Sequence, residues 1–131
     1  MIKLTIPGTP PSLNVWSRMH WSKAAKIKKQ WENDIWVCAY KAMAHTNKSK
    51  IPYGKAKVKL TYYFSSNRRR DIDNINQKFV LDGLVKAGVI ADDSAKVIGQ
   101  VEVIPEYDKV CSRVEIEVTE VSLLVDQPYV D

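Results

Sequence analysis

The sequence of 131 residues contains no long apolar run. A membrane-spanning helix needs roughly 20 consecutive apolar residues, and no segment of this chain approaches that length. The first residues reach Pro7 before they could form the apolar segment of a secretory signal. The sequence therefore predicts a protein without a membrane anchor, and we expect a cytoplasmic location.

Cysteines are also few, and the two that are present, Cys38 and Cys111, argue against a structural zinc site. They form no CxxC motif, and no histidine stands at the spacing that zinc ligands require. We expect both to be small, partly buried residues of regular elements. The sequence also lacks internal repeats and low-complexity linkers. Its length fits a single domain that covers residues 1–131.

The chain is basic, with 20 lysines and arginines against 15 aspartates and glutamates, and a net charge of +5. A basic balance favours an anionic partner, most often nucleic acid. The balance does not identify the partner, because many basic proteins bind no nucleic acid.

Helical spacing predicts two main helices. The first runs from Ser22, a plausible N-cap, to about Ala44. Trp31, Trp36 and Tyr40 give this helix a wide aromatic face, for which the core is a better prediction than a dimer interface.

The second helix is predicted from Asp73 to about Ala87. Either Asp73 or Asn74 can cap its start, and Gly88 stands where a C-terminal glycine belongs.

Alternating apolar residues predict four strands, at residues 2–6, 56–64, 96–104 and 110–119. We expect the last two to form an antiparallel hairpin. Residues 7–14 are predicted as a proline-rich extended loop and residues 45–55 as a polar loop, whereas residues 122–131 support no prediction. The order β-α-β-α-β-β predicts an α+β two-layer sandwich, with two helices packed on a mixed sheet.

Two aspartate pairs bracket the second predicted helix. Asp71 and Asp73 stand at positions i and i+2, which point to the same side in an extended chain. The pair Asp92 and Asp93 follows the helix, and the connection can return beside the preceding strand. Three carboxylates could then converge, and a cluster of oxygen ligands suits Mg²⁺.

A basic cluster, Arg68, Arg69 and Arg70, stands directly before the first acids. Such arginines can meet the phosphates on which a bound metal acts. Each feature alone has a simpler explanation: Asp73 as a helix cap, the second acid pair as a turn, the arginines as a solvated strand end, and Lys78 as a surface lysine. The spacing of the combined set leaves the two interpretations evenly balanced.

The stretch RRRDIDNINQKFVLDGLVKAGVIADD, residues 68–93, resembles the core motif of the RusA family of Holliday junction resolvases. That motif has basic residues, Asp-x-Asp-Asn, a helix with a lysine and an Asp-Ala-Leu-like segment, then glycine and an Asp-Asp pair. The segment IPGTPPSLNVWSR, residues 6–18, is similar to the Pro-Pro-Ser-x-Asn opening of the family. With the length and element order, the resemblance covers nearly the whole chain.

The resemblance implies a homodimeric, Mg²⁺-dependent endonuclease that cuts four-way DNA junctions. Asp71 and Asp73 match the Asp-x-Asp acids, and the family pattern favours Asp93 over its neighbour as the third catalytic acid. Lys78 matches the family's helical lysine, and Asp82 a helical acid further along.

This chain departs from the family pattern by one extra residue between Asp73 and Lys78. Without that insertion, Gln77 would take the place of the lysine.

We therefore predict that Asp71, Asp73 and Asp93 hold Mg²⁺ while Lys78 stabilises phosphate charge or orients water. The three arginines, residues 68–70, would grip the phosphate backbone without reading sequence. A C2 dimer would supply two related active sites for symmetric cuts. The alternatives are a non-catalytic protein that binds branched DNA, and a metal-dependent nuclease for other structured nucleic acids.

Two further tryptophans, Trp16 and Trp21, flank a loop near the N-terminus. They could stack on unpaired bases of a junction, although structural packing is the more common role for such residues.

Overall fold

The computed structural model describes residues 1–45 and 51–121, so the predicted loop at residues 45–55 is described only in part and residues 122–131 lie outside it. The described chain forms four strands and three α-helices, with one short 3₁₀ turn. The elements are β1 (Ile2–Pro7), α1 (Leu13–Ser17), α2 (Trp21–Met43), β2 (Ala56–Phe64), η2 (Ile72–Asn74), α3 (Lys78–Lys86), β3 (Ile98–Tyr107) and β4 (Arg113–Glu120).

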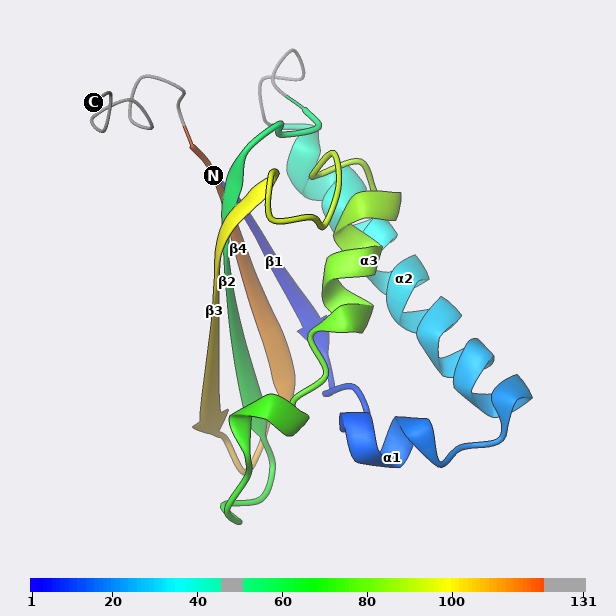
Figure 1. The fold of residues 1–131 in the computed structure, drawn as a ribbon. Helices are drawn as coiled ribbons and strands as arrows, with labels where there is room; N and C mark the ends of the chain where they lie inside the picture. The colour runs from blue at the N-terminus through cyan, green and yellow to red at the C-terminus, as the bar shows by residue number, and fades with distance from the viewer. Residues whose placement is uncertain (46–50, 122–131) are drawn as a thin grey trace, which may run out of the picture.

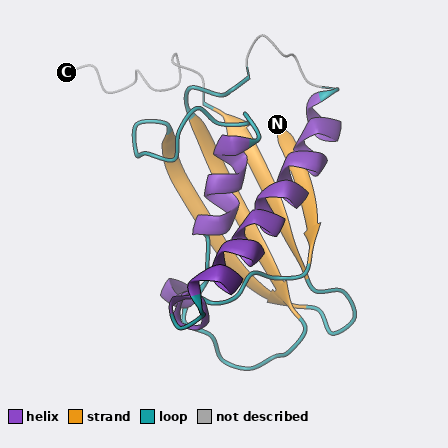
Figure 2. Cartoon of the chain, turned by 90° about the vertical axis from the view of Figure 1, so that its right-hand side faces the viewer, coloured by secondary structure: helices purple, strands orange, loops and turns teal. Residues whose placement is uncertain are grey.

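The strands form one mixed sheet with the order β1-β4-β2-β3. β4 is antiparallel to both β1 and β2, whereas β3 is parallel to β2. Helices α2 and α3 pack side by side against one face of this sheet (Figures 1 and 2). The α+β two-layer architecture predicted from the sequence is therefore confirmed.

The predicted hairpin between the last two strands is wrong, because β2 lies between β3 and β4. Helix α3 returns the chain so that β3 runs parallel to β2, on its outer edge. Pro105 and the mostly exposed side chains of β3 suit an edge position. In β4, by contrast, Val114, Ile116 and Val118 are fully buried, and both edges of this strand are paired, one with β1 and the other with β2.

The core lies between the sheet and the two long helices. β2 occupies the residues predicted for it, and Val58, Leu60 and Tyr62 point into the core as the alternation indicated. The helices approach each other closely at Gly83, where an added Cβ would lie 2.6 Å from Cδ1 of Ile35. A small residue on α3 at this point allows α2 and α3 to pack together above the sheet.

Helix α2 buries only part of the aromatic face predicted for it. Trp31 belongs to the core, as expected. Trp36 and Tyr40 do not, since they are 52% and 66% exposed, and their rings stack on each other at 5.7 Å. The buried positions Trp31, Ile35 and Ala39 follow a spacing of four residues. Trp36 and Tyr40 each lie one position after a member of this stripe and are turned away from the core.

Near the N-terminus, the short helix α1 begins at Leu13, within the last two residues of the predicted extended loop, and continues to Ser17. Ser12 caps it by accepting a hydrogen bond from the Val15 N–H at 3.3 Å. Helix α2 begins at Trp21 with His20 as its N-cap, two residues before the predicted cap Ser22, and ends at Met43.

The two cysteines are both free thiols. Cys38 is half-buried in α2, as predicted, but Cys111 is exposed in the connection between β3 and β4. The expectation of a regular element was wrong for Cys111 because β4 begins only at Arg113.

Candidate functional site

The first acid pair lies in a turn and not in an extended strand end. Asp71 has extended backbone angles (φ −88°, ψ 130°), but Asp73 lies inside η2. The geometry expected for positions i and i+2 of a strand was therefore wrong. Both side chains are exposed, and among the residues that the structure describes no hydrogen bond or ion pair engages either carboxylate. These are strongly hydrated oxygens that are available to a cation.

Asn76 fixes this turn to the rest of the fold. Its side chain is almost fully buried; its Nδ2 donates to the Pro11 carbonyl at 3.1 Å, and its Oδ1 accepts from the Phe79 N–H at 3.3 Å. The Tyr62 hydroxyl donates to the Asn76 carbonyl at 2.8 Å. Because Ile75 and Asn76 are drawn into the core, the predicted helix is interrupted, and α3 begins at Lys78 instead of Asp73. Gly88, with φ at 77°, follows the end of α3 as predicted.

A cleft of about 550 Å³ opens beside Asp71. Residues 9–12 form one wall, residues 68–71 form another, and Tyr62 and Phe64 of β2 contribute to its lining. Three arginines and one carboxylate therefore share a single concave surface. This mixture suits a polyanionic ligand that is bound together with a cation.

Arg70 is held in this wall by contacts on several sides. Its guanidinium lies 3.9 Å from the centre of the Phe64 ring, and it donates to Ser66 Oγ at 3.0 Å and to the Arg68 carbonyl at 3.2 Å. Burial and the nearby charge of Arg68 lower the pKa of Arg70, but an arginine remains protonated at neutral pH. Arg70 is therefore a fixed positive charge at the edge of the cleft.

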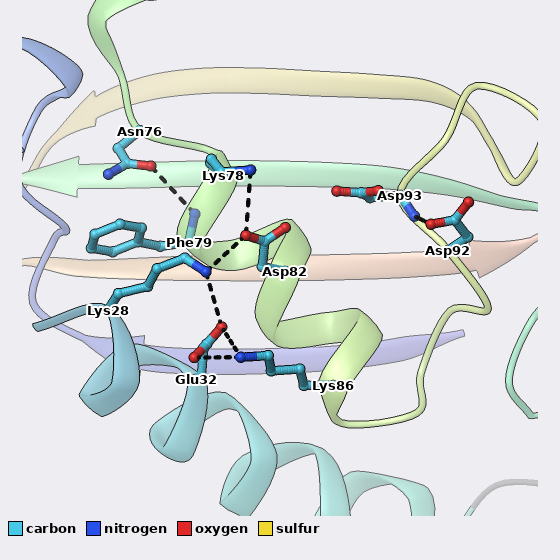
Figure 3. Close-up of polar contacts among 9 residues, drawn as sticks. All are labelled: Lys28, Glu32, Asn76, Lys78, Phe79, Asp82, Lys86, Asp92 and Asp93. Carbon is cyan, nitrogen blue, oxygen red and sulfur yellow. Dashed lines mark hydrogen bonds and ion pairs between the residues drawn. The ribbon is translucent and has the colours of Figure 1, made fainter. Parts of the chain in front are cut away.

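An ion-pair network lies along the α2–α3 contact (Figure 3). The Asp82 carboxylate lies 3.0 Å from the Lys28 ammonium and 3.6 Å from that of Lys78. Lys28 also contacts Glu32 at 3.3 Å, and Lys86 contacts Glu32 at 3.0 Å. Burial of Asp82 opposes its ionisation, but the hydrogen bond from Lys28 and the charges of Lys28 and Lys78 outweigh this effect and lower its pKa.

The two acids of the second pair have different surroundings. Asp92 accepts a hydrogen bond from the Asp93 N–H at 2.9 Å, which is a local turn contact. The Asp93 carboxyl points toward Asp82 and Lys78, whereas that of Asp92 turns away from them (Figure 3). Of the two acids, Asp93 is therefore the one that joins the surface formed by α3.

A family model described as endodeoxyribonuclease RusA matches residues 11–119. The chain belongs to the RusA endodeoxyribonuclease family. The match spans the arginines, Lys78 and both acid pairs. As a member of this family, the chain is a Holliday junction resolvase, a nuclease of DNA recombination and repair. No curated protein sequence matched the chain. Along the described segments, the structure contains no helix with both the length and the apolar character to cross a membrane.

This RusA-family chain divides most of its predicted site residues between two groups. Asp71 shares the cleft with residues 68–70, while Lys78 contacts Asp82 and Asp93 points toward both of them (Figure 3). Within residues 1–45 and 51–121, no three His, Cys, Asp or Glu side chains are gathered closely enough to hold a metal ion. The assignment of Asp71, Asp73 and Asp93 as common ligands therefore stays a prediction.

Three residues that support this site were not identified from the sequence. The N-cap preference of asparagine is a signal that could have identified Asn76, which stands three residues before a buried phenylalanine. Lys28 and Glu32 form an i,i+4 pair on α2, but their contacts with α3 depend on how the helices pack.

The tryptophans near the N-terminus divide between two environments. Trp16 packs edge-on against Phe79 with 5.0 Å between the ring centres, whereas Trp21 is 77% exposed and lies against His20. Trp16 is thus accounted for by packing, and Trp21 is the one whose ring is accessible.

Proposed function

We propose that this RusA-family nuclease nicks four-way DNA junctions with Mg²⁺ held at Asp71 and Asp73, and with Asp93 as a further ligand. The observation that carries the proposal is the exposed, unengaged carboxylate of Asp71, which shares one cleft with three arginines and lies two residues before the equally exposed Asp73. Acids next to a phosphate-binding surface would repel DNA unless a cation lies between them.

The chemistry of the donors fits Mg²⁺. Asp71 and Asp73 offer only oxygen, and their exposure leaves room for water, which Mg²⁺ retains when it binds to proteins. One or two protein carboxylates together with a substrate phosphate are typical of such sites, so a closed cage of acids is not required. When bound, the ion supplies Lewis-acid polarisation of the phosphodiester.

The chain's own cations would bind and orient the DNA. Arg70, stacked on Phe64, offers its guanidinium to a backbone phosphate without having to be ordered first. Arg68 and Arg69 extend this positive wall along the strand. Lys78 is half-exposed on the first turn of α3, where its ammonium can neutralise charge on the phosphate that is cut, or orient water.

We expect Asp71→Asn to abolish cleavage of a synthetic four-way junction and to leave binding intact or stronger. The substitution removes a negative charge that both binds Mg²⁺ and repels phosphate. Single-turnover cleavage is measured in Mg²⁺ and in EDTA, and binding is measured without metal. Asp34→Asn, which removes one carboxylate from α2, is the matched control and should cut at the wild-type rate. An Asp71→Asn variant that cuts at the wild-type rate would exclude Asp71 as a ligand.

The second acid pair provides an internal comparison. Asp93→Asn should lose more activity than Asp92→Asn, because only Asp93 points toward Asp82 and Lys78. Wild-type activity in both variants would remove the pair from the site.

The same proposal includes a C2 homodimer, because symmetric resolution needs two cutting sites on one junction. An exposed aromatic pair on α2, Trp36 and Tyr40, supports an interface on this helix. Tyr40 also lines a mainly apolar pocket of about 320 Å³ together with Met43 and Ile51. Exposed apolar side chains that gather on one surface can mark a contact between proteins.

Light scattering at micromolar concentration tests the dimer. Trp36→Ser should shift the chain toward monomers, whereas Trp21→Ser removes an exposed tryptophan from the start of α2 and should not. Dimers that combine one wild-type and one Asp71→Asn subunit should nick one strand of a junction in closed-circular DNA and then stall. A monomer that makes paired cuts in one binding event would refute the dimer.

A further inference from the structure

Lys28 is the innermost cation of the network between α2 and α3. Its ammonium lies 3.0 Å from Asp82 and 3.3 Å from Glu32, and its side chain is 25% exposed. Lys78, in comparison, is 56% exposed and stands further from Asp82, at 3.6 Å. The Asp82 carboxylate is therefore engaged mainly by a cation from another helix, and only weakly by the lysine on its own helix.

Both lysines contact the same oxygen atom, Oδ2 of Asp82. The Asp93 carboxyl points toward Asp82 and Lys78 (Figure 3). One carboxylate thus contacts the lysine and faces the acid that the proposed function assigns to the DNA. If Lys28 were absent, Lys78 would be the remaining cation on Asp82, and the half-buried negative charge would draw its ammonium inward. The same uncompensated charge would repel Asp93.

We propose that Lys28 is a positioning residue for the cleavage reaction. It holds Asp82 from α2, so that Asp82 presents Lys78 and Asp93 to the phosphate without capturing the Lys78 ammonium. This inference rests on the proposed function, since it assumes that Lys78 and Asp93 act on the DNA. Lys28 itself contacts neither DNA nor metal in this role.

Lys86 provides a comparison within the same network. It joins the same two helices through Glu32 at 3.0 Å, carries the same charge and makes no contact with Asp82. If the network only held α2 against α3, the loss of Lys86 and the loss of Lys28 would affect the enzyme in similar ways. A positioning role requires that cleavage depends on Lys28 far more than on Lys86.

The experiment compares Lys28→Met, Lys28→Arg and Lys86→Met in full-length protein. Three quantities are measured: the single-turnover cleavage rate at saturating junction in Mg²⁺, the junction affinity without metal, and the thermal midpoint. We expect Lys28→Met to lose about tenfold or more in rate, because small misplacements of reacting groups have large effects. Its affinity should stay within about threefold of wild type, since its charge is turned toward α3 and not toward DNA.

The controls separate positioning from folding. Lys28→Arg keeps the charge on Asp82 and should restore the rate to within about threefold of wild type, and Lys86→Met should also remain within about threefold. Lys28→Gln, which removes only the charge, replaces Lys28→Met if that variant does not fold, with the same expected loss of rate. The proposal is overturned if the Lys28 variant cuts at the wild-type rate, or if Lys86→Met loses as much rate as Lys28→Met.

Asp71→Asn is measured in the same series so that two failures can be told apart. An active Asp71→Asn enzyme contradicts the proposed function itself. An inactive Asp71→Asn enzyme beside a fully active Lys28→Met enzyme contradicts only the role of Lys28.

Discussion

Asn76→Ala should lower the free energy of unfolding by more than most substitutions of a single polar residue do. The change removes two hydrogen bonds and leaves the Pro11 carbonyl and the Phe79 N–H without their partner. An orphaned buried group costs about 1–3 kcal/mol. The Pro11 bond is only part-buried, so water can replace some of its loss. We therefore expect the free energy of unfolding to fall by about 2–4 kcal/mol.

Urea denaturation followed by circular dichroism measures this change. The midpoint should fall while the slope m stays the same, because the substitution does not alter the surface exposed on unfolding. For a chain of this length, 1 kcal/mol corresponds to roughly 3–5 °C in Tm, so the melting temperature should fall by about 6–20 °C.

The matched control is Asn74→Ala, an identical substitution two positions earlier. Asn74 makes one exposed contact, in which its Oδ1 accepts from the Asn14 N–H at 3.0 Å. Its loss should reduce stability by less than about 1 kcal/mol. If Asn76→Ala were as stable as Asn74→Ala, the buried hydrogen bonds of Asn76 would not be what fixes the turn.

Two further predictions concern charge. Binding to junctions should weaken with salt. Replacing Arg69 and Arg70 with alanine should reduce the slope of log affinity against log salt by up to about two. An unchanged slope would mean that these arginines face away from DNA. The hydrogen bond from Arg113, followed by two backbone N–H groups, lowers the pKa of Asp108. Since its folded pKa is depressed, its stabilisation is present above the unfolded value, near pH 4, and is lost as the pH falls through the folded value. Asp108→Asn should therefore differ from wild type in stability at neutral pH and converge with it in strong acid, and a constant difference would contradict this account.

The alternation of apolar and polar residues predicted an element well where one of its faces is buried and the other is exposed. The alternation of β2 led to the observed bounds because one of its faces is buried beneath the helices. The hairpin prediction was wrong because it assumed that consecutive strands are neighbours in the sheet. Which strands pair depends on how distant elements pack, and the alternation within one strand does not reveal this. Pro105 was the signal that β3 belongs at an edge, but it could not indicate which strand lies beside it.

The sequence suggested residues for the site but not their geometry, and the roles of these residues stay predictions. The resemblance directed attention to Asp71, Asp73 and Lys78, and the family match covers all of them. The start of α3 was missed because Asn76 is buried by contacts with Pro11, a residue distant in sequence. Lys28 was not identified because its acidic partner lies on another helix, and a helical pattern does not reveal how two helices pack.

The pairing of β1 with β4 has a consequence for biosynthesis. Among the described strands, β1 has β4 as its only partner, and β4 also covers one edge of β2. A nascent chain that has emerged from the ribosome only as far as β3 can form the parallel β2–β3 pair and the helices, but β1 has no strand with which to pair. The sheet therefore closes only when residues 113–120 are available, which makes the contact between distant segments a late step in folding. Until then the inner edge of β2 is an open strand edge on the ribosome-bound chain, where a chaperone or a second chain could pair with it.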